Sequence, residues 1–219
     1  MMLRARFCLL ATPFLTLMVM ATRLDAQEPR LAGRLPGPVL QRIDSLLDAA
    51  RRNGLPTEPL VDRALEGLAK GAAPDRIEPA VLRLSDELRL ARTAFGDAAT
   101  AAELMAGASA IRAGATTESL LRLRESRPDQ PLTVPAGVLA DLVAAGVDIQ
   151  DGVTAVLAIV AAEDADYVAF RRNVERDIAL GASPAAALGV RLRGMTEVLV
   201  PGDASVGVGS GGTRRKRKP

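Results

Sequence analysis

The chain repeats one local pattern from residue 36 to about residue 195: an aliphatic stripe at helical spacing, a glycine, and a residue suited to cap the next helix. In the segment 36–54 the apolar residues recur at intervals of three and four, and Asn53-Gly54 ends the stripe. This spacing places them on one face of an α-helix, and glycine tolerates the left-handed conformation that ends many helices. The same kind of junction recurs in NGLPT, KGAAPD, AGATT, AGVDIQD and LGASPA. We therefore predict an all-α protein, a compact array of eight or nine short helices.

The recurring junctions allow two interpretations. Superposing Gly71 on Gly146 aligns residues 80–84 with residues 155–159, and superposing Gly71 on Gly181 aligns GAAP with GASP. One interpretation is a stack of helical hairpins built from degenerate repeats. The other is that a glycine followed by a capping residue is simply how an alanine-rich chain joins its helices. The irregular spacing of the glycines identifies no repeat family.

One segment leaves its secondary structure open. Residues 153–160 are the most apolar stretch after the leader and are rich in β-branched side chains, which suit a strand. The flanking alanines and the length of the segment favour a helix. Beyond it, Ser183-Pro184 has the signature of a helix start, a capping hydroxyl followed by proline in the first turn. The helical pattern then fades after about Met195.

Proline, glycine and charge divide the chain into segments. The stretch SRPDQPLTVP contains three prolines and is the clearest internal break. The segments that we predict are a signal peptide (1–26), an exposed arm (27–35), a helical subdomain (36–126), a proline-rich hinge (127–134), a second helical subdomain (135–195) and a flexible glycine- and serine-rich linker with a basic tail (196–219).

Residues 1–26 have the features of a secretory signal peptide. Arg4 and Arg6 precede the apolar stretch 7–21, and Ala26 is the small residue expected before a cleavage site. A retained membrane anchor is the alternative, but the apolar stretch is shorter than the ~20 residues that span a bilayer and contains a proline. We expect export to the periplasm or the extracellular space of a bacterium after cleavage near Ala26.

The residue types that are missing exclude several classes of enzyme. The chain has no histidine, and its only cysteine, Cys8, lies in the predicted leader. A nucleophile activated by a histidine is therefore impossible, and zinc, copper and haem sites lose their usual ligands. Lys70 is the only lysine outside the tail, and no S-x-x-K motif precedes it. We predict no catalytic residues, no metal ligands and no cofactor.

Acidic residues cluster where two helices are predicted to begin. Asp148 and Asp151 form one group, and Glu163, Asp164 and Asp166 form the other. Carboxylates at such positions cap free N–H groups and face the positive end of the helix dipole. A site for a hard cation is the alternative, but neither group has the spacing of a calcium-binding loop. We interpret both groups as helix caps.

Paired carboxylates also serve glycoside hydrolysis. The mature chain contains only three aromatic residues, however, whereas clefts that bind sugars are usually lined with aromatic platforms. Phe95, Tyr167 and Phe170 all fall on predicted apolar faces and are expected in the core.

The C-terminal tail carries five consecutive positive charges. Once the leader is removed, basic and acidic residues balance, and the body without its tail is acidic. A basic run binds polyanions by charge alone, and the anions outside the cytoplasm are membrane lipids or cell-wall polymers. No aromatic residue interrupts the run, so base stacking and specific nucleic-acid binding are not indicated. A solubilising terminus without a target is the alternative. The candidate residues are Arg214, Arg215, Lys216, Arg217 and Lys218.

These observations favour a non-enzymatic, exported helical scaffold or protein-binding module of the bacterial envelope. Its partner would be a protein or peptide that the sequence does not identify, and its tail would attach it to anionic surfaces. The alternative is an envelope enzyme that uses carboxylates, with or without a metal ion.

Overall fold

The computed structural model describes residues 28–199, so the predicted leader and the basic residues 214–218 lie outside the described part of the chain. Between residues 28 and 199 the protein is all helical, with nine helices and no strand. The all-α prediction is confirmed. The helices are α1 (Gly37–Arg52), α2 (Glu58–Ala69), α3 (Pro74–Phe95), α4 (Ala101–Ala113), α5 (Thr117–Ser126), α6 (Thr133–Ala144), α7 (Ile149–Ala158), α8 (Asp164–Ala179) and α9 (Pro184–Leu199).

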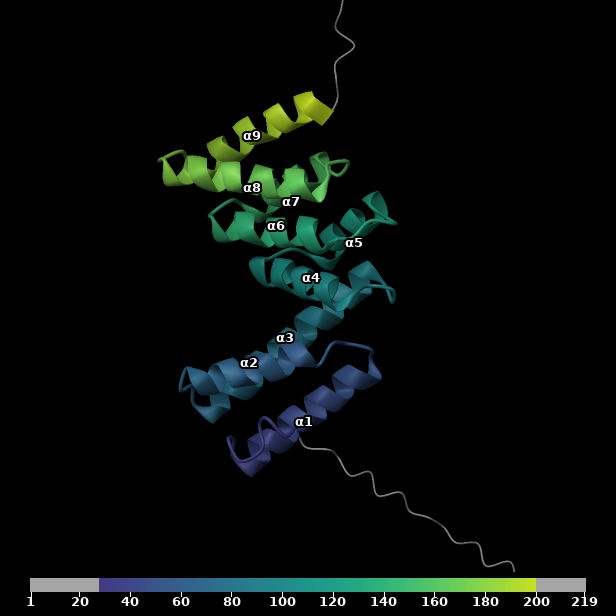
Figure 1. Ribbon diagram of the computed structural model, residues 1–219, viewed down its shortest axis with the longest axis vertical. Coiled ribbons are helices and arrows are strands. Elements are labelled where there is room, and N and C mark those ends of the chain that lie inside the picture. The colour runs from purple at the N-terminus through teal and green to yellow at the C-terminus, as the bar shows by residue number, and fades with distance from the viewer. Residues whose placement is uncertain (1–27, 200–219) are drawn as a thin grey trace, which may run out of the picture.

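The helices form a stack of antiparallel hairpins. Figure 1 shows α1 at one end of the stack and α9 at the other. The odd-numbered helices contact one another in series from α1 to α9, and α4, α6 and α8 form a second series. Each hairpin therefore contributes one helix to each of two layers. Within residues 28–199, no helix combines the length and the apolar character needed to cross a bilayer.

Four glycine turns with the same hydrogen bonds join the two helices of each hairpin. Gly71, Gly114, Gly146 and Gly181 all have positive φ, between 66° and 112°. Each glycine donates its N–H to the carbonyl three residues earlier, and the next residue donates to the carbonyl five residues before itself. This is the Schellman motif. In all four turns the next helix begins three residues after the glycine, so the turns α2–α3, α4–α5, α6–α7 and α8–α9 are locally equivalent.

The core consists of two hydrophobic clusters. The first joins α1, α2, α3 and the start of α4, and the second extends from the end of α3 to α9. Ala99 and Ile111 pack against both clusters, so the division passes through α3 and α4. The three aromatic residues of the predicted mature chain lie in the second cluster, as expected. The clusters do not divide at residues 127–134, where the prolines suggested a boundary.

The predicted exposed arm is anchored by two buried leucines, while most of its described residues are exposed. Residues 29–35 form turns that precede α1, Leu31 is fully buried, and Leu35 is 7% exposed. Both leucines belong to the first hydrophobic cluster. The two leucines are four residues apart, but a single such pair is too short to define a helical stripe, so the sequence pattern did not reveal their burial.

The proline-rich segment predicted as a hinge is held in place by long-range contacts. Arg127, which ends α5, is 3% exposed, and Leu132, which precedes α6, is fully buried. The Leu132 N–H donates to the Glu103 carboxylate at 3.0 Å. These contacts, together with those of Arg127 to the carbonyls of Val160 and Ala162, tie the segment to α4 and to the α7–α8 connection.

The local helix signals were mostly correct. The Ser183 hydroxyl accepts from the N–H of Ala186 at 3.3 Å and caps α9, as predicted. Thr57 precedes α2, but its side chain makes no capping hydrogen bond. The apolar segment near residue 153 is helical, which settles its two interpretations in favour of the helix. Helix α9 continues to Leu199, beyond the predicted end near Met195.

Candidate functional site

The edge of the stack opposite the four glycine turns carries the remaining connections, of which the α1–α2 turn at Gly54 has the same two hydrogen bonds as those turns. The α1–α2 turn lies there, followed by the connections 96–100, 127–132 and 159–163, all on the right in Figure 1. In repeat architectures, the face that gathers variable connections often binds ligands. We call this face the connection edge.

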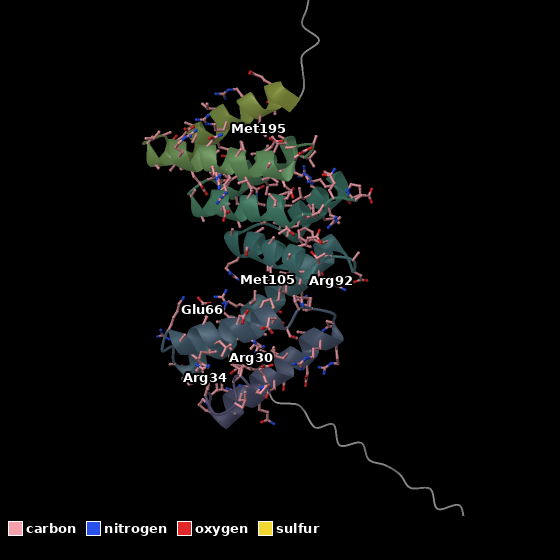
Figure 2. The ribbon with its side chains drawn as sticks, viewed as in Figure 1. Arg30, Arg34, Glu66, Arg92, Met105 and Met195 are labelled. Atoms are coloured by element: carbon pink, nitrogen blue, oxygen red, sulfur yellow. The ribbon has the colours of Figure 1, made fainter. Side chains whose placement is uncertain are left out.

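Arg92 joins the first two connections of this edge. It lies near the end of α3 and is labelled in Figure 2. Its guanidinium forms an ion pair with Asp97, with 3.1 Å between Nε and Oδ1. The same group donates to the carbonyl oxygen of Gly54 at 3.3 Å. One side chain therefore links the α1–α2 turn to the α3–α4 connection.

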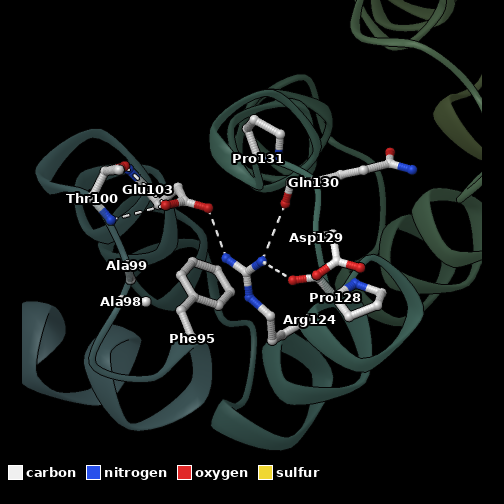
Figure 3. A pocket seen from close by; sticks show the side chains of 10 residues that line it. All are labelled: Phe95, Ala98, Ala99, Thr100, Glu103, Arg124, Pro128, Asp129, Gln130 and Pro131. Carbon is white, nitrogen blue, oxygen red and sulfur yellow. Dashed lines mark hydrogen bonds and ion pairs between the residues drawn. The ribbon is translucent and has the colours of Figure 1, made fainter.

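Arg124 makes a similar link one hairpin further along. Its Nη2 lies 2.7 Å from Oε1 of Glu103, and its Nη1 donates to three carbonyls of the α5–α6 connection, at 3.1 to 3.3 Å. The guanidinium carbon lies 5.8 Å from the centre of the Phe95 ring, within the range of a cation–π interaction. Figure 3 shows Arg124 between Glu103 and the connection.

Glu103 is a buried carboxylate, 6% exposed, that is bound from four directions. Thr100 donates to it through its N–H and its hydroxyl, each at 2.9 Å. The Leu132 N–H and Arg124 donate to the other oxygen. Burial on its own raises the pKa of Glu103, but the hydrogen bonds from Thr100, Leu132 and Arg124 outweigh it and lower the pKa to about 2.

Arg127 extends the series to the third connection. Its Nη1 donates to the carbonyl oxygens of Val160 and Ala162, at 3.1 and 2.9 Å. Its guanidinium carbon lies 5.4 Å from the centre of the Tyr167 ring. Arginine side chains near helix C-termini commonly bind free carbonyls, but here the carbonyls belong to a neighbouring hairpin. The result is a connection edge whose shape is fixed by internal partners.

A pocket of about 320 Å³ opens beside Arg124 between two of the connections (Figure 3). Its walls are largely apolar, with the exposed Asp129 at the rim. The Glu103–Arg124 pair forms part of its wall, and both groups are already engaged by the protein. We call it the apolar pocket. It is lined by Phe95, Ala98, Ala99, Thr100, Glu103, Arg124, Pro128, Asp129, Gln130 and Pro131.

A second pocket, of about 370 Å³, adjoins the first along the chain. Gly96 and Asp97 line it, and the next two residues line the apolar pocket, so a single connection separates the two. Its other walls carry amide, hydroxyl and guanidinium groups. We call it the polar pocket. The lining residues are Asn53, Leu55, Arg89, Arg92, Thr93, Gly96 and Asp97.

A third concavity, of about 250 Å³, lies on the helical surface of α2, α3 and α4. Three arginines line it, but two of them are paired: Arg63 with Glu66 at 3.3 Å, and Arg112 with Glu87. These pairs reduce the positive charge that the concavity offers to a ligand.

The predicted site residues 214–218 lie outside the described residues. The two acidic groups do not come together with each other. Asp148 caps α7 by accepting from the N–H groups of Gln150 and Asp151, at 2.8 and 3.4 Å. Asp166 accepts from the N–H of Glu163 at 3.3 Å at the start of α8. These contacts confirm the capping interpretation for Asp148 and Asp166, whereas Asp164 forms an ion pair with Arg127. Between residues 28 and 199, no group of three or more acidic, histidine or cysteine side chains is arranged to hold a metal ion.

Sequence reasoning missed the residues that shape the connection edge. Glu103 carried a readable signal, because Thr100-x-x-Glu103 is a capping-box pattern, and the box is present in the structure. Nothing local marked Arg124 or Arg127, whose partners are up to 37 residues away. Comparison of the chain with protein-family models, with curated proteins and with solved structures found no match.

Proposed function

We propose that the protein is a binding scaffold that takes an extended peptide segment of a partner protein along its connection edge. The observation that carries this proposal is the presence of two adjacent pockets on that edge, with one connection between them. Each pocket has the size of a small-ligand site at the lower end of the usual range. A single side chain of a partner fits such a volume.

The arginine contacts support this proposal by making the edge rigid before a partner arrives. Arg92 and Arg127 bind carbonyls of neighbouring connections, and Arg124 binds carbonyls of the connection that follows its own helix. A site that is already ordered loses less conformational entropy on binding than one that must fold around its ligand. The same contacts leave these guanidinium groups with little capacity to bind the ligand directly, so shape contributes more to recognition than charge does.

The two pockets differ in chemistry and therefore define the partner. The apolar pocket accepts an aliphatic or aromatic side chain against Phe95 and the neighbouring prolines and alanines. Asp129 at its rim favours a basic residue next to that side chain. The polar pocket offers Asn53, Arg89 and Thr93, which suit an amide or carboxylate group. The preferred segment is thus an apolar residue with a polar or acidic residue nearby.

The predicted alternative, a carboxylate-based enzyme, has no specific observation in its favour. A general acid needs a pKa near the working pH, and the pKa of Glu103 is lowered to about 2. Its four hydrogen-bond donors all come from the protein.

Export and the basic tail remain part of the proposal. The tail would hold the scaffold near an anionic membrane or cell-wall polymer, with about 1 kcal/mol gained per basic residue at a membrane surface. Deletion of residues 213–219 is expected to leave the thermal midpoint unchanged and to weaken retention on anionic vesicles. The retention of the full chain should also fall as salt is added. Equal retention of both chains would refute the tether.

Peptide display tests the binding site. A random peptide library is selected against the mature chain, and the selected peptides are measured against two variants. Ala98→Arg places a long side chain at an exposed position that lines the apolar pocket, and Ala185→Arg makes the same change at an exposed position of α9. We expect Ala98→Arg to weaken binding at least about tenfold, equivalent to about 1.4 kcal/mol, and Ala185→Arg to leave it unchanged. Equal binding by both variants, or no selected peptide, would contradict the proposal.

A further inference from the structure

The concavity on α2, α3 and α4 brings together three arginines from three different helices. Arg63 lies on α2, Arg83 on α3 and Arg112 on α4, and all three line the same space of about 250 Å³. Its apolar wall consists of Ala80 and the buried Leu84. Guanidinium groups that line one small space repel one another, and an apolar wall strengthens the repulsion. Such a cluster therefore needs anions that compensate its charge.

Glu87 supplies one of these anions but does not use all the donors of its partner. The two Glu87 oxygens accept from Nε and Nη2 of Arg112, and the Glu87 side chain is 15% exposed. A bidentate pair of this kind fixes the plane of the guanidinium. Within the described residues, Nη1 of Arg112 makes no hydrogen bond, so this arginine keeps donors for a ligand.

The other two arginines have more donors to offer. Arg63 lies 3.3 Å from Glu66 but donates no hydrogen bond to it, whereas Lys70 donates to Glu66 at 2.6 Å. Arg83 is exposed, and between residues 28 and 199 it takes part in no ion pair and no side-chain hydrogen bond. The three arginines and Lys70 thus exceed the carboxylates of Glu66 and Glu87 by two positive charges. This excess stands out because the body of the chain is acidic.

We propose that this concavity is a binding site for a phosphate monoester. A phosphate group carries about 1.5 to 2 negative charges at pH 7 and three strong acceptor oxygens. Its charge matches the excess at the site, and its tetrahedral shape accepts from guanidinium groups that approach from three helices. A planar carboxylate has one charge and two oxygens, so it satisfies fewer of these donors.

The size and the position of the concavity limit the ligand further. Its volume lies below the usual range for small-molecule sites, so it fits the phosphate and a few attached atoms. Such a group occurs on soluble phosphorylated molecules and on lipid headgroups, and binding measurements distinguish the two sources. The site lies on the helices and not on the connection edge, so the inference does not depend on the proposed peptide binding.

A soluble monoester tests the chemistry of the site. Glycerol 3-phosphate is titrated into the mature chain by isothermal titration calorimetry, and glycerate, a small carboxylate with the same two hydroxyl groups, is the matched ligand. We expect glycerate to bind at least tenfold more weakly than glycerol 3-phosphate. Equal affinities for the two ligands would overturn the assignment of a phosphate site.

Two variants separate the concavity from the basic tail, which both of them retain. Arg83→Gln removes the guanidinium without an internal partner, so the thermal midpoint of the ligand-free chain should not change. Arg122→Gln makes the same change at an exposed position of α5. We expect Arg83→Gln to weaken the binding of glycerol 3-phosphate at least tenfold and Arg122→Gln to change it less than twofold. Equal affinities of the two variants would overturn the proposal.

Vesicles that contain phosphatidic acid, whose headgroup is also a phosphate monoester, test the lipid source. Retention on these vesicles is compared for Arg83→Gln and Arg122→Gln. A selective loss by Arg83→Gln would assign the site to the lipid headgroup. Equal retention, combined with the selective loss of glycerol 3-phosphate binding, would assign it to a soluble monoester. A selective loss in neither measurement would overturn the proposal.

Discussion

The buried carboxylate of Glu103 makes the stability of the fold depend on pH in a way that one substitution removes. Glu103→Gln keeps the shape of the side chain but loses its charge. The amide retains a single acceptor oxygen, whereas the carboxylate of Glu103 accepts from Thr100, Leu132 and Arg124 with both oxygens. The substitution also leaves the guanidinium of Arg124 without its anionic partner.

The contribution of Glu103 to the free energy of unfolding follows from its pKa. The pKa of Glu103 is lowered from its ordinary value of 4.5 to about 2 in the folded protein. Because the folded pKa lies below the unfolded one, the unfolded chain binds the proton more readily. The stabilisation is therefore complete above pH 4.5 and is lost as the pH falls from 4.5 through about 2. At 1.36 kcal/mol for each pH unit, the contribution of ionised Glu103 at neutral pH is about 3 kcal/mol.

Urea denaturation at a series of pH values between 7 and 2 measures this contribution. We expect Glu103→Gln to be about 3 kcal/mol less stable than the original chain at pH 7, with the difference shrinking steadily below pH 4.5. Glu125→Gln, at an exposed position of α5, is the matched control and should follow the original chain throughout. A difference for Glu103→Gln that stays constant from pH 7 to pH 2 would refute the reasoning.

Four further substitutions test the packing and the turns of the stack, each by urea or thermal denaturation. Gly107→Ala should cost about 1–3 kcal/mol, because its methyl group would lie 2.7 Å from the ring of Phe95. Gly137→Ala, where no atom lies within 4 Å, should instead stabilise α6 by about 0.5–1 kcal/mol; the same sign for both would contradict the packing. Gly71→Ala should cost about 1 kcal/mol because its φ is +66°. Tyr167→Phe should cost about 1 kcal/mol, since the hydroxyl donates to a helix carbonyl at 3.1 Å. An unchanged stability of Gly71→Ala would contradict the need for a positive φ at residue 71. An unchanged stability of Tyr167→Phe would contradict the hydrogen bond of the Tyr167 hydroxyl.

The parts of the fold that depend on neighbouring residues could be predicted from the sequence. Hydrogen bonds within a few residues determine the all-helical class of the fold and the ends of the helices at glycine. They also determine the caps at Asp148 and Ser183. The equivalence of the four glycine turns also has a local cause, since the same Schellman geometry places each next helix three residues after its glycine. Local signals repeated along the chain were enough to predict an all-α array of helices, but they left open whether the helices stack as repeated hairpins.

The candidate site could not be predicted in the same way, because its contacts join residues that are far apart in sequence. Arg92 binds a carbonyl 38 residues away, and Arg127 binds one 35 residues away. In the sequence both arginines look like ordinary cations near a helix C-terminus. The burial of Leu31 was missed for the same reason, since its partners in the first hydrophobic cluster come from distant helices.

The two edges of the stack are therefore held by different physical means, and this difference bears on function. At the glycine edge each turn is closed by its own hydrogen bonds, so a substitution there affects one hairpin. At the connection edge Arg92 and Arg127 bind the backbone of another connection, and Arg124 joins Glu103 of α4 to the connection that follows its own helix. The shape of one pocket then depends on the neighbouring hairpin. Both adjacent pockets lie on this edge. A partner bound there would contact several hairpins at once, and its binding energy would stabilise their stacking.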